Sequence, residues 1–225
     1  MKKLFALLLL PSIAFAGKIG ENYVGAQIGF ADVGANLAGV KYTWDGFCYE
    51  LKGNLAISNQ ESYGIDLHAS FLHGPSLEGP VNSESDISFF NGVARPYVKF
   101  NNFILFANLG FSAASWEIDI KASTTEISFD ETEFSPGLGL QAQFDKVTIT
   151  PSFDYVNYGE DTIIGNTVWE DGKALIYTIP VSYQYSDKVD FTFKYEIADF
   201  EELSINGLKY GYLYDSLMFG LDYKF

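Results

Sequence analysis

The chain has 225 residues, of which 48% are hydrophobic and 17% aromatic, and its formal net charge is −15. The aromatic content argues against a disordered chain, and the negative charge argues against nucleic acid as a partner, because phosphate binding needs clustered Lys and Arg. A single cysteine excludes an intrachain disulfide. The longest apolar run, Leu4 to Leu10, is far shorter than the ~20 residues of a membrane-spanning helix, so this is not a helical membrane protein.

The N-terminus has the pattern of a secretory signal peptide. Two lysines precede a short apolar core, and Ala14-Phe15-Ala16 is an A-x-A-like cleavage site. We therefore expect cleavage before Gly17, with residues 1–16 as the signal peptide and residues 17–225 as one mature domain.

Apolar and polar residues alternate along the whole mature chain, and helical periodicity is hard to find. The segments 134–144, 147–155 and 189–197 are clear examples. Such segments are about ten residues long, enough for a tilted strand to cross a bilayer, which favours a membrane barrel over a soluble sandwich. We predict ten strands, with eight or twelve as alternatives. Their expected positions are 22–31, 37–44, 47–57, 89–100, 103–116, 133–144, 147–158, 174–185, 189–198 and 214–225.

The predicted connections alternate between short turns and long loops, which is typical of membrane barrels. The short turns are Asp45-Gly46, Asn101-Asn102, Asp145-Lys146 and Ser186-Asp187-Lys188, and the long loops are 58–88, 117–132, 159–173 and roughly 199–212. An even strand count places both termini on the side of the short turns, the periplasm. Segment 62–72 also alternates, and we expect it to project above the membrane within the second loop. The predicted fold is all-β: an antiparallel, up-and-down transmembrane β-barrel.

Aromatic residues crowd the predicted strand ends, as an interfacial girdle would. Residues that close a two-residue turn should share a face, because a one-residue slip in register would invert every side chain. The pairs Trp44/Phe47, Phe100/Phe103 and Phe144/Val147 are all apolar. We interpret them as outward-facing pairs at one edge of the membrane.

Two segments carry a resemblance to a known family. The opening strand Tyr23-Val24-Gly25-Ala26-Gln27-Ile28-Gly29-Phe30 and the final residues Leu221-Asp222-Tyr223-Lys224-Phe225 resemble those of small bacterial outer-membrane β-barrels of the OmpA/OmpX and "porin family" type. The resemblance implies a bacterial outer-membrane location, with membrane lipid and lipopolysaccharide as surroundings. It also implies that Leu221, Tyr223 and Phe225 form the signal read by the barrel-assembly machinery.

The alternation also predicts which charged residues face the barrel interior. Mixed signs inside a small barrel most simply form ion pairs, and small barrels of about eight strands leave room only for side chains, so a packed lumen is favoured over an open pore. Small inward residues leave some space, and a narrow conduit stays an alternative. The predicted lumen-facing network consists of Lys41, Glu50, Lys52, Arg95, Lys99, Asp154, Asp190, Lys194, Glu196, Asp222 and Lys224.

Candidate catalytic residues are few. His68 lies two residues from both Asp66 and Ser70 in the predicted second loop, which also contains His73. Outer-membrane barrels include lipid A deacylases with a His-x-Ser pair and proteases with an Asp-His pair, but no surrounding motif supports catalysis here. We interpret His68 as a solvated loop residue and Cys48 as an inward packing residue. The acidic clusters of the loops could bind Ca²⁺ or Mg²⁺, including ions that bridge lipopolysaccharide phosphates. None has the spacing of a calcium loop, and we interpret them as a solvated surface, so no metal or cofactor is predicted.

Two functions therefore stay open. The first is a non-enzymatic barrel whose long acidic extracellular loops contact surface ligands, or which adds structure to the membrane. The alternative is a narrow porin-like channel for ions or small solutes, whose acidic mouths would favour cations.

Overall fold

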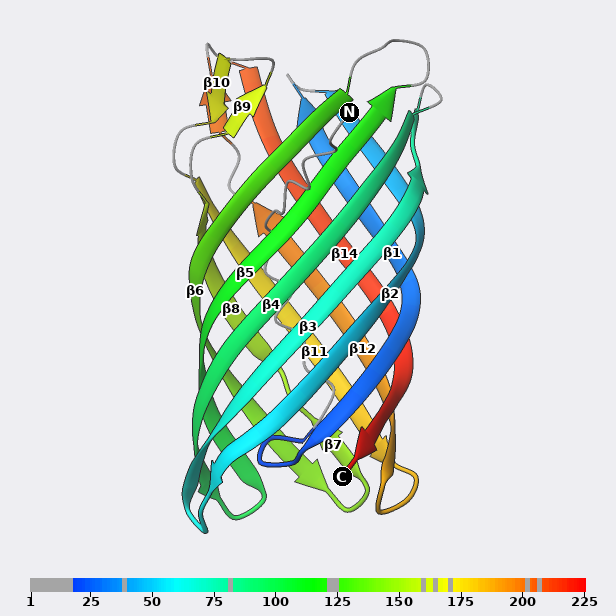
Figure 1. Ribbon diagram of the computed structural model, residues 1–225. Helices are drawn as coiled ribbons and strands as arrows, with labels where there is room; N and C mark the ends of the chain where they lie inside the picture. The colour runs from blue at the N-terminus through cyan, green and yellow to red at the C-terminus, as the bar shows by residue number, and fades with distance from the viewer. Residues whose placement is uncertain are drawn as a thin grey trace, which may run out of the picture.

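The computed structural model describes residues 18–37, 40–80, 83–120, 126–158, 161–163, 166–169, 172–200, 203–205 and 208–225. Every regular element in these ranges is a β-strand, and ten strands close into an antiparallel barrel (Figure 1). The predicted fold class and strand number are thereby confirmed. The predicted signal peptide, residues 1–16, lies outside the described residues. No helix within the described ranges has the length and apolar character needed to span a bilayer.

Nine wall strands are single elements, and the tenth is divided into two. The single strands are β1 (Tyr23–Leu37), β2 (Val40–Asn59), β3 (Tyr63–Glu78), β4 (Ser83–Phe100), β5 (Phe103–Ile120), β6 (Glu126–Phe144), β11 (Gly172–Gln184), β12 (Val189–Phe200) and β14 (Leu208–Lys224). The divided strand consists of β7 (Val147–Ile149) and β8 (Ser152–Tyr158). The short strands β9 (Asp161–Ile163) and β10 (Asn166–Trp169) pair with each other, and β13 (Leu203–Ile205) pairs with β14.

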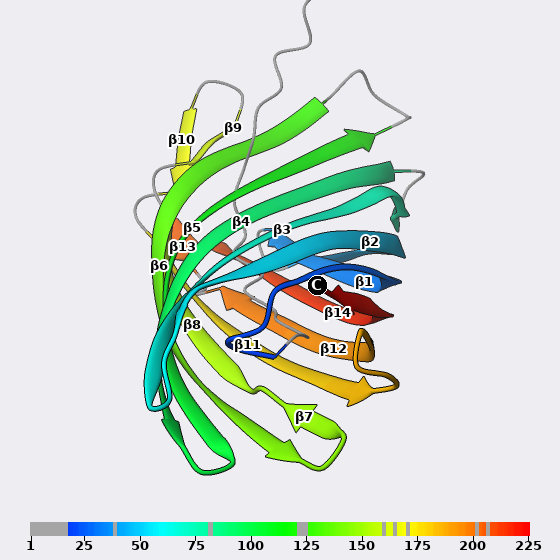
Figure 2. The ribbon, with the colours of Figure 1, turned by 60° about the horizontal axis from the view of Figure 1, so that its bottom comes forward.

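The barrel closes through β1, which pairs with β2 on one side and with β14 on the other. Ile28 of β1 lies opposite Tyr49 of β2 and Phe219 of β14. Each other wall strand pairs with the next wall strand along the chain, so the topology is up-and-down. Figure 2 shows the resulting ring with one end turned forward.

Short turns after β4 and β6 occur where the sequence predicts them. Phe100 pairs directly with Phe103, and Phe144 with Val147. The turn residues Asn101 and Asp145 have φ angles of 54° and 51°, the left-handed conformation that tight hairpin turns require. A third short connection, residues 185–188, joins β11 to β12.

The predicted turn at Asp45-Gly46 is wrong. β2 runs through these residues without interruption, and Trp44 is buried while Phe47 is exposed, so this pair does not share a face. Gly46 faces Leu77 of β3, and a Cβ on Gly46 would lie only 2.9 Å from Leu77 Cδ2. The glycine gives space to a neighbouring side chain instead of forming a turn.

Segment 62–72 is also placed differently from the prediction. It belongs to β3, which pairs with β2 and β4 and is therefore a wall strand rather than a projection above the membrane. The true short connection lies at residues 60–62, between β2 and β3. Two predicted strands merge into β2 and one strand is gained as β3, so the total remains ten.

The wall strands are longer than predicted, and the loops are correspondingly shorter. Loop 58–88 consists mostly of β3 and the ends of its neighbours, and within 117–132 the strands β5 and β6 stay paired as far as Asp119 and Glu126. Region 159–173 contains β9 and β10, and 199–212 contains β13. The apolar pattern marks only the part of a strand that crosses hydrocarbon, whereas backbone pairing continues beyond it.

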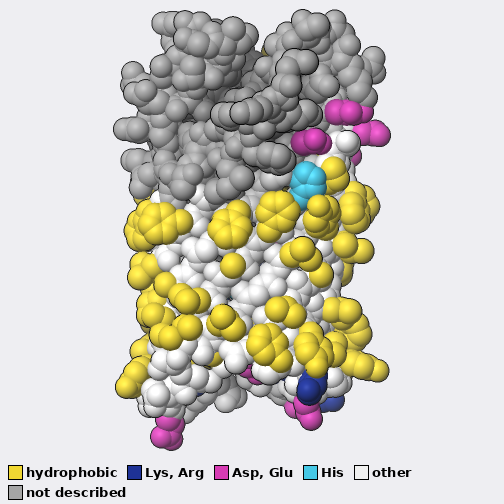
Figure 3. Space-filling view, viewed as in Figure 1, with side chains coloured by type: hydrophobic (Ala, Val, Ile, Leu, Met, Phe, Trp, Pro, Cys, Tyr) yellow, Lys and Arg dark blue, Asp and Glu magenta, His cyan; other side chains and the backbone are white. Residues whose placement is uncertain are grey.

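Apolar side chains cover the outside of the wall, and polar side chains fill the inside. Leu51, Phe111 and Leu138 are exposed, while Asn108 and Lys194 are fully buried. Figure 3 shows the apolar side chains as a band around the wall, with charged side chains beyond it. This arrangement is the reverse of a soluble sandwich and is what the alternation predicts.

The last residue meets the chain just ahead of β1 at one end of the barrel. Phe225 N donates a hydrogen bond to Asn22 O at 3.2 Å, beside the short turns that follow β4, β6 and β11 (Figure 1). We call this the turn end and the opposite end the loop end.

Candidate functional site

Ten of the eleven residues of the predicted charged network lie on inward faces of wall strands. Lys99 and Lys224 are half-buried near the turn end. Lys41 is exposed on the outward face of β2, so its predicted place in the lumen is wrong. The error arose because the assumed turn at Asp45-Gly46 inverted the alternation ahead of it. The fully enclosed members are Glu50, Lys52, Arg95, Asp154, Asp190, Lys194, Glu196 and Asp222.

Lys194 of β12 holds two carboxylates in the lumen. Its Nζ lies 3.2 Å from Oε2 of Glu50 on β2 and 4.0 Å from Oε2 of Glu196, and all three side chains are 0% exposed. Thr178 of β11 donates a hydrogen bond to Glu196 Oε2 at 3.3 Å. A buried charge is tolerated only when it is paired, so these three side chains depend on one another. The ion pair between Lys194 and Glu50 therefore links β12 to β2 across the two strands between them, β14 and β1.

A second ion pair lies directly over a glycine of β1. Lys52 of β2 and Asp222 of β14 are the cross-strand neighbours of Gly25, and Lys52 Nζ lies 2.9 Å from Asp222 Oδ1. A Cβ on Gly25 would lie 2.1 Å from that carboxylate oxygen. Because Gly25 has no side chain, Lys52 and Asp222 can form an ion pair although β2 and β14 are not adjacent strands.

The same arrangement occurs on the other side of the ring, over Gly137 of β6. Its neighbours Asn108 of β5 and Asp154 of β8 meet above it, with Asn108 Nδ2 donating to Asp154 Oδ1 at 2.9 Å. Arg95 Nε donates to Asn108 Oδ1 at 3.2 Å, and the guanidinium lies 5.1 Å from the ring centroid of Phe106. These contacts fill the lumen inside β4, β5, β6 and β8.

His68, which the sequence analysis places in a solvated loop, is buried in the lumen. It lies on β3 with 3% of its surface exposed, and the Tyr23 hydroxyl is 3.3 Å from its Nδ1. Asp66 accepts hydrogen bonds from Asn54 Nδ2 at 3.1 Å and from Gly20 N at 2.8 Å. The prediction failed because the strand that carries both residues was assigned to a loop. Cys48 is fully buried on the inward face of β2.

Residues 18–22, which we call the N-terminal segment, cross the turn end inside the ring of strands (Figure 2). Ile19 is 4% exposed and packs against Tyr97 and Phe106, with Ile104 beside them. An apolar contact therefore fixes the segment within an otherwise polar interior.

Hydrogen bonds anchor the N-terminal segment to four wall strands: β2, β3, β6 and β11. They are Asn54 Nδ2 to Glu21 O (2.8 Å), Gly20 N to Asp66 Oδ2 (2.8 Å), Ile19 N to Gln141 Oε1 (2.9 Å) and Lys18 Nζ to Gln184 Oε1 (3.0 Å). Such widely spaced anchors hold the segment across the opening rather than along one wall.

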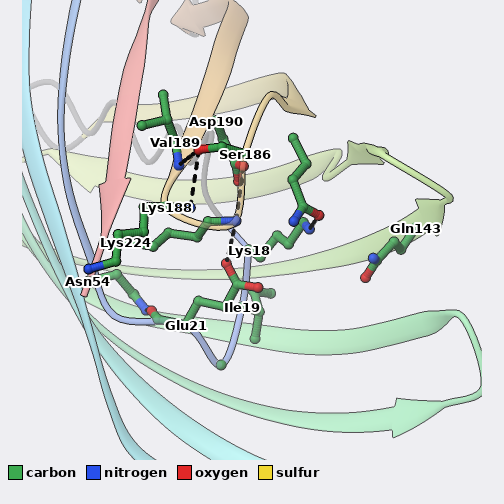
Figure 4. A network of polar contacts seen from close by, with 12 residues as sticks. Lys18, Ile19, Glu21, Asn54, Gln143, Ser186, Lys188, Val189, Asp190 and Lys224 are labelled. Atoms are coloured by element: carbon green, nitrogen blue, oxygen red, sulfur yellow. Dashed lines mark hydrogen bonds and ion pairs between the residues drawn. The ribbon is translucent and has the colours of Figure 1, made fainter.

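An ion-pair group fastens the segment to the last strand. Lys224 Nζ of β14 lies 3.0 Å from Asp190 Oδ1 of β12 and 3.7 Å from Glu21 Oε2 of the N-terminal segment (Figure 4). Burial raises the pKa of the Glu21 carboxyl above its usual value, and the ammonium of Lys224 opposes that shift. Ion pairs thus join the N-terminal segment to β14 and β12 at the turn end.

A cavity of about 480 Å³ opens beside the N-terminal segment at the turn end. Besides that segment, its lining includes Asn59, Lys99, Asn101, Asn102, Gln141 and Gln143. Deeper in the lumen, Arg95, Tyr23, Tyr214, Phe89 and Lys194 are among the largest fully buried side chains. The lumen is therefore filled by side chains behind this mouth.

Replacing Ile19 with Asp should release the N-terminal segment and leave the barrel folded. A carboxylate cannot be buried against Tyr97 and Phe106 without a large desolvation cost, whereas no hydrogen bond of the wall depends on this residue. Hydrogen–deuterium exchange of amides 18–22 should become faster, with a change of less than ~2 kcal/mol in the free energy of unfolding. Asp187→Asn, at an exposed turn residue, is the matched control. Unchanged exchange in Ile19→Asp would contradict the anchoring role.

The sequence analysis missed several polar residues of the lumen. Asn54, Asp66 and His68 all occupy even positions of alternating segments, so the signal was present once β3 is recognised as a wall strand. The sequence did not predict the N-terminal segment, because residues 18–22 have no periodic pattern. Within the described ranges, no group of three or more His, Cys, Asp or Glu side chains is placed to hold a metal ion.

Comparison with known proteins agrees with this geometry. Residues 4–184 match the family described as outer membrane protein beta-barrel domain. The chain belongs to this family of outer-membrane barrels. That membership places it in the bacterial outer membrane and agrees with the OmpA/OmpX-like resemblance in the sequence. No curated protein matches the sequence.

Solved structures share the fold at low sequence identity. The outer membrane protease OmpT of Escherichia coli matches with a TM-score of 0.56 and 10% identity, covering 94% of this chain and 99% of that one. The translocator domain of the autotransporter NalP of Neisseria meningitidis matches with 0.51 and 12%, covering 93% and 89%. The transport unit of the autotransporter AIDA-I of Escherichia coli matches with 0.50 and 11%, covering 95% and 94%. These likenesses concern the fold alone.

Proposed function

We propose that this protein is a non-enzymatic, non-conducting outer-membrane barrel that acts through the surface of its loop end. The observation that carries the proposal is the filled lumen. In an open pore the charged side chains of the wall would be wetted, whereas Glu50, Lys194 and Glu196 are 0% exposed, with the Lys194 ammonium forming an ion pair with each carboxylate. Behind them, the N-terminal segment crosses the turn end. Among the described residues, packing of this kind favours a closed lumen over a route for solute.

A row of carboxylates on the outside supports a role for the loop end. Its five members are outward-facing cross-strand neighbours on β14, β1, β2, β3 and β4. They are Asp215, Asp32, Asp45, Glu78 and Glu84. Like charges in directly opposed positions repel, so this row needs water and cannot face hydrocarbon. We infer that the wall beyond Phe30, which is 70% exposed and precedes Asp32 on β1, stands outside the bilayer.

The orientation follows from the same features. We place the turn end, with residues 18–22 and Phe225, in the periplasm, and the loop end with its carboxylate row at the cell surface, where lipopolysaccharide is the adjacent lipid. The outward-facing Leu221, Tyr223 and Phe225 of the last strand remain our proposed signal for the barrel-assembly machinery. Surface contacts would then be made by a rigid acidic rim of paired strands rather than by long flexible loops alone.

A structural role for His68 supports the non-enzymatic part of the proposal. Its partner is the Tyr23 hydroxyl, and the nearby Asp66 anchors the N-terminal segment. A nucleophilic or acid–base mechanism needs substrate access, which this buried position does not offer. Turnover of lipid A or of a peptide that is lost in a His68→Ala variant would contradict this view.

Reconstitution into planar lipid bilayers tests the proposal directly. The wild-type barrel should show no steady unitary current. The positive control lacks residues 18–22 and carries Glu50→Ala, Lys194→Ala and Glu196→Ala, which removes both obstructions. It should conduct, which would show that the assay detects an opened lumen. Steady unitary currents from the wild-type protein would overturn the proposal and favour the narrow porin-like channel.

A further inference from the structure

Two prolines interrupt neighbouring positions of the barrel wall. Thr150 and Pro151 separate β7 from β8. On one side Leu140 N donates to Pro151 O at 3.0 Å, and on the other Thr150 N donates to Pro180 O at 3.0 Å. In a regular antiparallel ladder each of these pairs would exchange a second hydrogen bond, but proline has no N–H to donate.

The ladder is therefore weakened on both sides of the same strand. The carbonyls of Leu140 and Thr150 cannot receive their ladder hydrogen bonds from Pro151 and Pro180. Proline is normally confined to edge strands and bulges, because a missing hydrogen bond is costly, and most costly in hydrocarbon where no water replaces it.

A groove of about 410 Å³ lies on the outside of the wall at this interruption. Its outward-facing lining consists of Pro151 and six residues from four wall strands: Leu105, Leu138, Leu140, Phe153, Tyr177 and Ile179. The groove also reaches Gly139, Ser152 and Thr178, which belong to the inward-facing set of residues. It therefore extends to the backbone of the wall, and none of its lining residues is charged.

Gly139 lies beneath this groove. A Cβ on Gly139 would lie 2.1 Å from Phe106 Cζ, so the ring of Phe106 covers the glycine from the lumen side. Phe106 in turn packs with Ile19 and Tyr97. At Gly139, apolar groups thus lie on both sides of the wall.

We propose that this groove is a binding site for one hydrocarbon chain of a membrane lipid. Two observations select this occupant: the outward-facing lining is apolar, and its residues belong to the exposed apolar side chains of the wall that face the bilayer. A flat wall touches an acyl chain on one side only, whereas the groove also contacts its flanks and buries more apolar surface. The volume lies within the range of small-molecule sites.

Fluorescence quenching by a brominated fatty acid tests the site. Tyr177→Trp places a reporter on the groove, and Phe219→Trp places the matched reporter on exposed apolar wall elsewhere, each in a full-length chain whose three native tryptophans are replaced by Phe. In detergent micelles titrated with dibromostearic acid, the groove reporter should be quenched saturably, at a concentration about tenfold lower than the control. That ratio corresponds to about two additional buried methylenes.

A second variant shows whether the interruption creates the site. Pro151→Ile restores a backbone donor for the Leu140 carbonyl, so the variant should fold. Its branched side chain enters the groove, so quenching of the Tyr177→Trp reporter should then need the same concentration of dibromostearic acid as quenching of the Phe219→Trp control. Should Pro151→Ile fail to fold, Leu138→Phe fills the groove without changing the ladder and should give the same shift. The proposal would be overturned if the two reporters are quenched equally when the groove is unmodified. It would also be overturned if Pro151→Ile or Leu138→Phe leaves the quenching of the groove reporter unchanged.

Discussion

A Lys194→Met variant should lower the free energy of unfolding by about 3–5 kcal/mol, the cost expected when one partner of a buried ion pair is removed. Lys194 lies within 3.2 Å of Glu50 and 4.0 Å of Glu196, and all three side chains are shielded from water. Without the ammonium, two carboxylates face each other in the lumen with only Thr178 donating to one of them. Methionine keeps the volume, so the loss reports charge pairing rather than a cavity.

Urea unfolding in lipid vesicles, followed by tryptophan fluorescence, would measure this loss. Lys146→Met is the matched control, because Lys146 is exposed in the short turn after β6 and its replacement should cost about 1 kcal/mol or less. Adding Glu50→Gln and Glu196→Gln to Lys194→Met should recover most of the lost stability, since no unpaired charge is then buried. If Lys194→Met costs no more than Lys146→Met, the lumen is wetted and the proposal of a packed barrel is wrong.

The sequence predicts the barrel well because its strongest signal, alternation, is also the feature that a bilayer enforces. It predicts strand boundaries poorly for a related reason. Asp-Gly is a strong hairpin signal, yet Gly46 lies within β2, where its missing side chain leaves room for Leu77. The sequence alone does not distinguish a glycine that forms a turn from one that makes room for a neighbouring side chain. The paired ends of β5 and β6 pass beyond the apolar band, where alternation no longer distinguishes strand from loop.

The candidate site was predictable in composition but not in its contacts. Alternation identifies Lys52, Asp222 and Asp154 as inward residues, but which acid meets which base depends on cross-strand register. The positions of Gly25 and Gly137 decide those contacts, because each lets the side chains on its two flanks meet. The N-terminal segment was beyond prediction, because its anchors come from four strands far apart in sequence.

Successive residues of a wall strand face the polar lumen and the hydrocarbon of the bilayer in turn, and this limits where a charged substitution is tolerated. An inward charge needs a partner within reach, as Lys194 has in Glu50. An outward charge is tolerated only beyond the apolar band, as in the row that includes Asp32 and Asp45. A charge placed on the outward face within the band satisfies neither condition and should be the most damaging kind of substitution.

Phe219→Arg makes such a change and should cost about 2–4 kcal/mol and impair assembly, as should Leu140→Arg. Phe219 is 54% exposed on the outward face of β14, where its ring centroid lies 5.1 Å from that of Phe193. Tyr185→Arg is the control, because Tyr185 is 65% exposed beside a short turn, where an arginine near the interface costs about 0–1 kcal/mol. Folding yields in vesicles and unfolding free energies should both rank Phe219→Arg below Tyr185→Arg. The opposite ranking would mean that the exposed apolar band does not face lipid, and the assignment of inward and outward faces would fail with it.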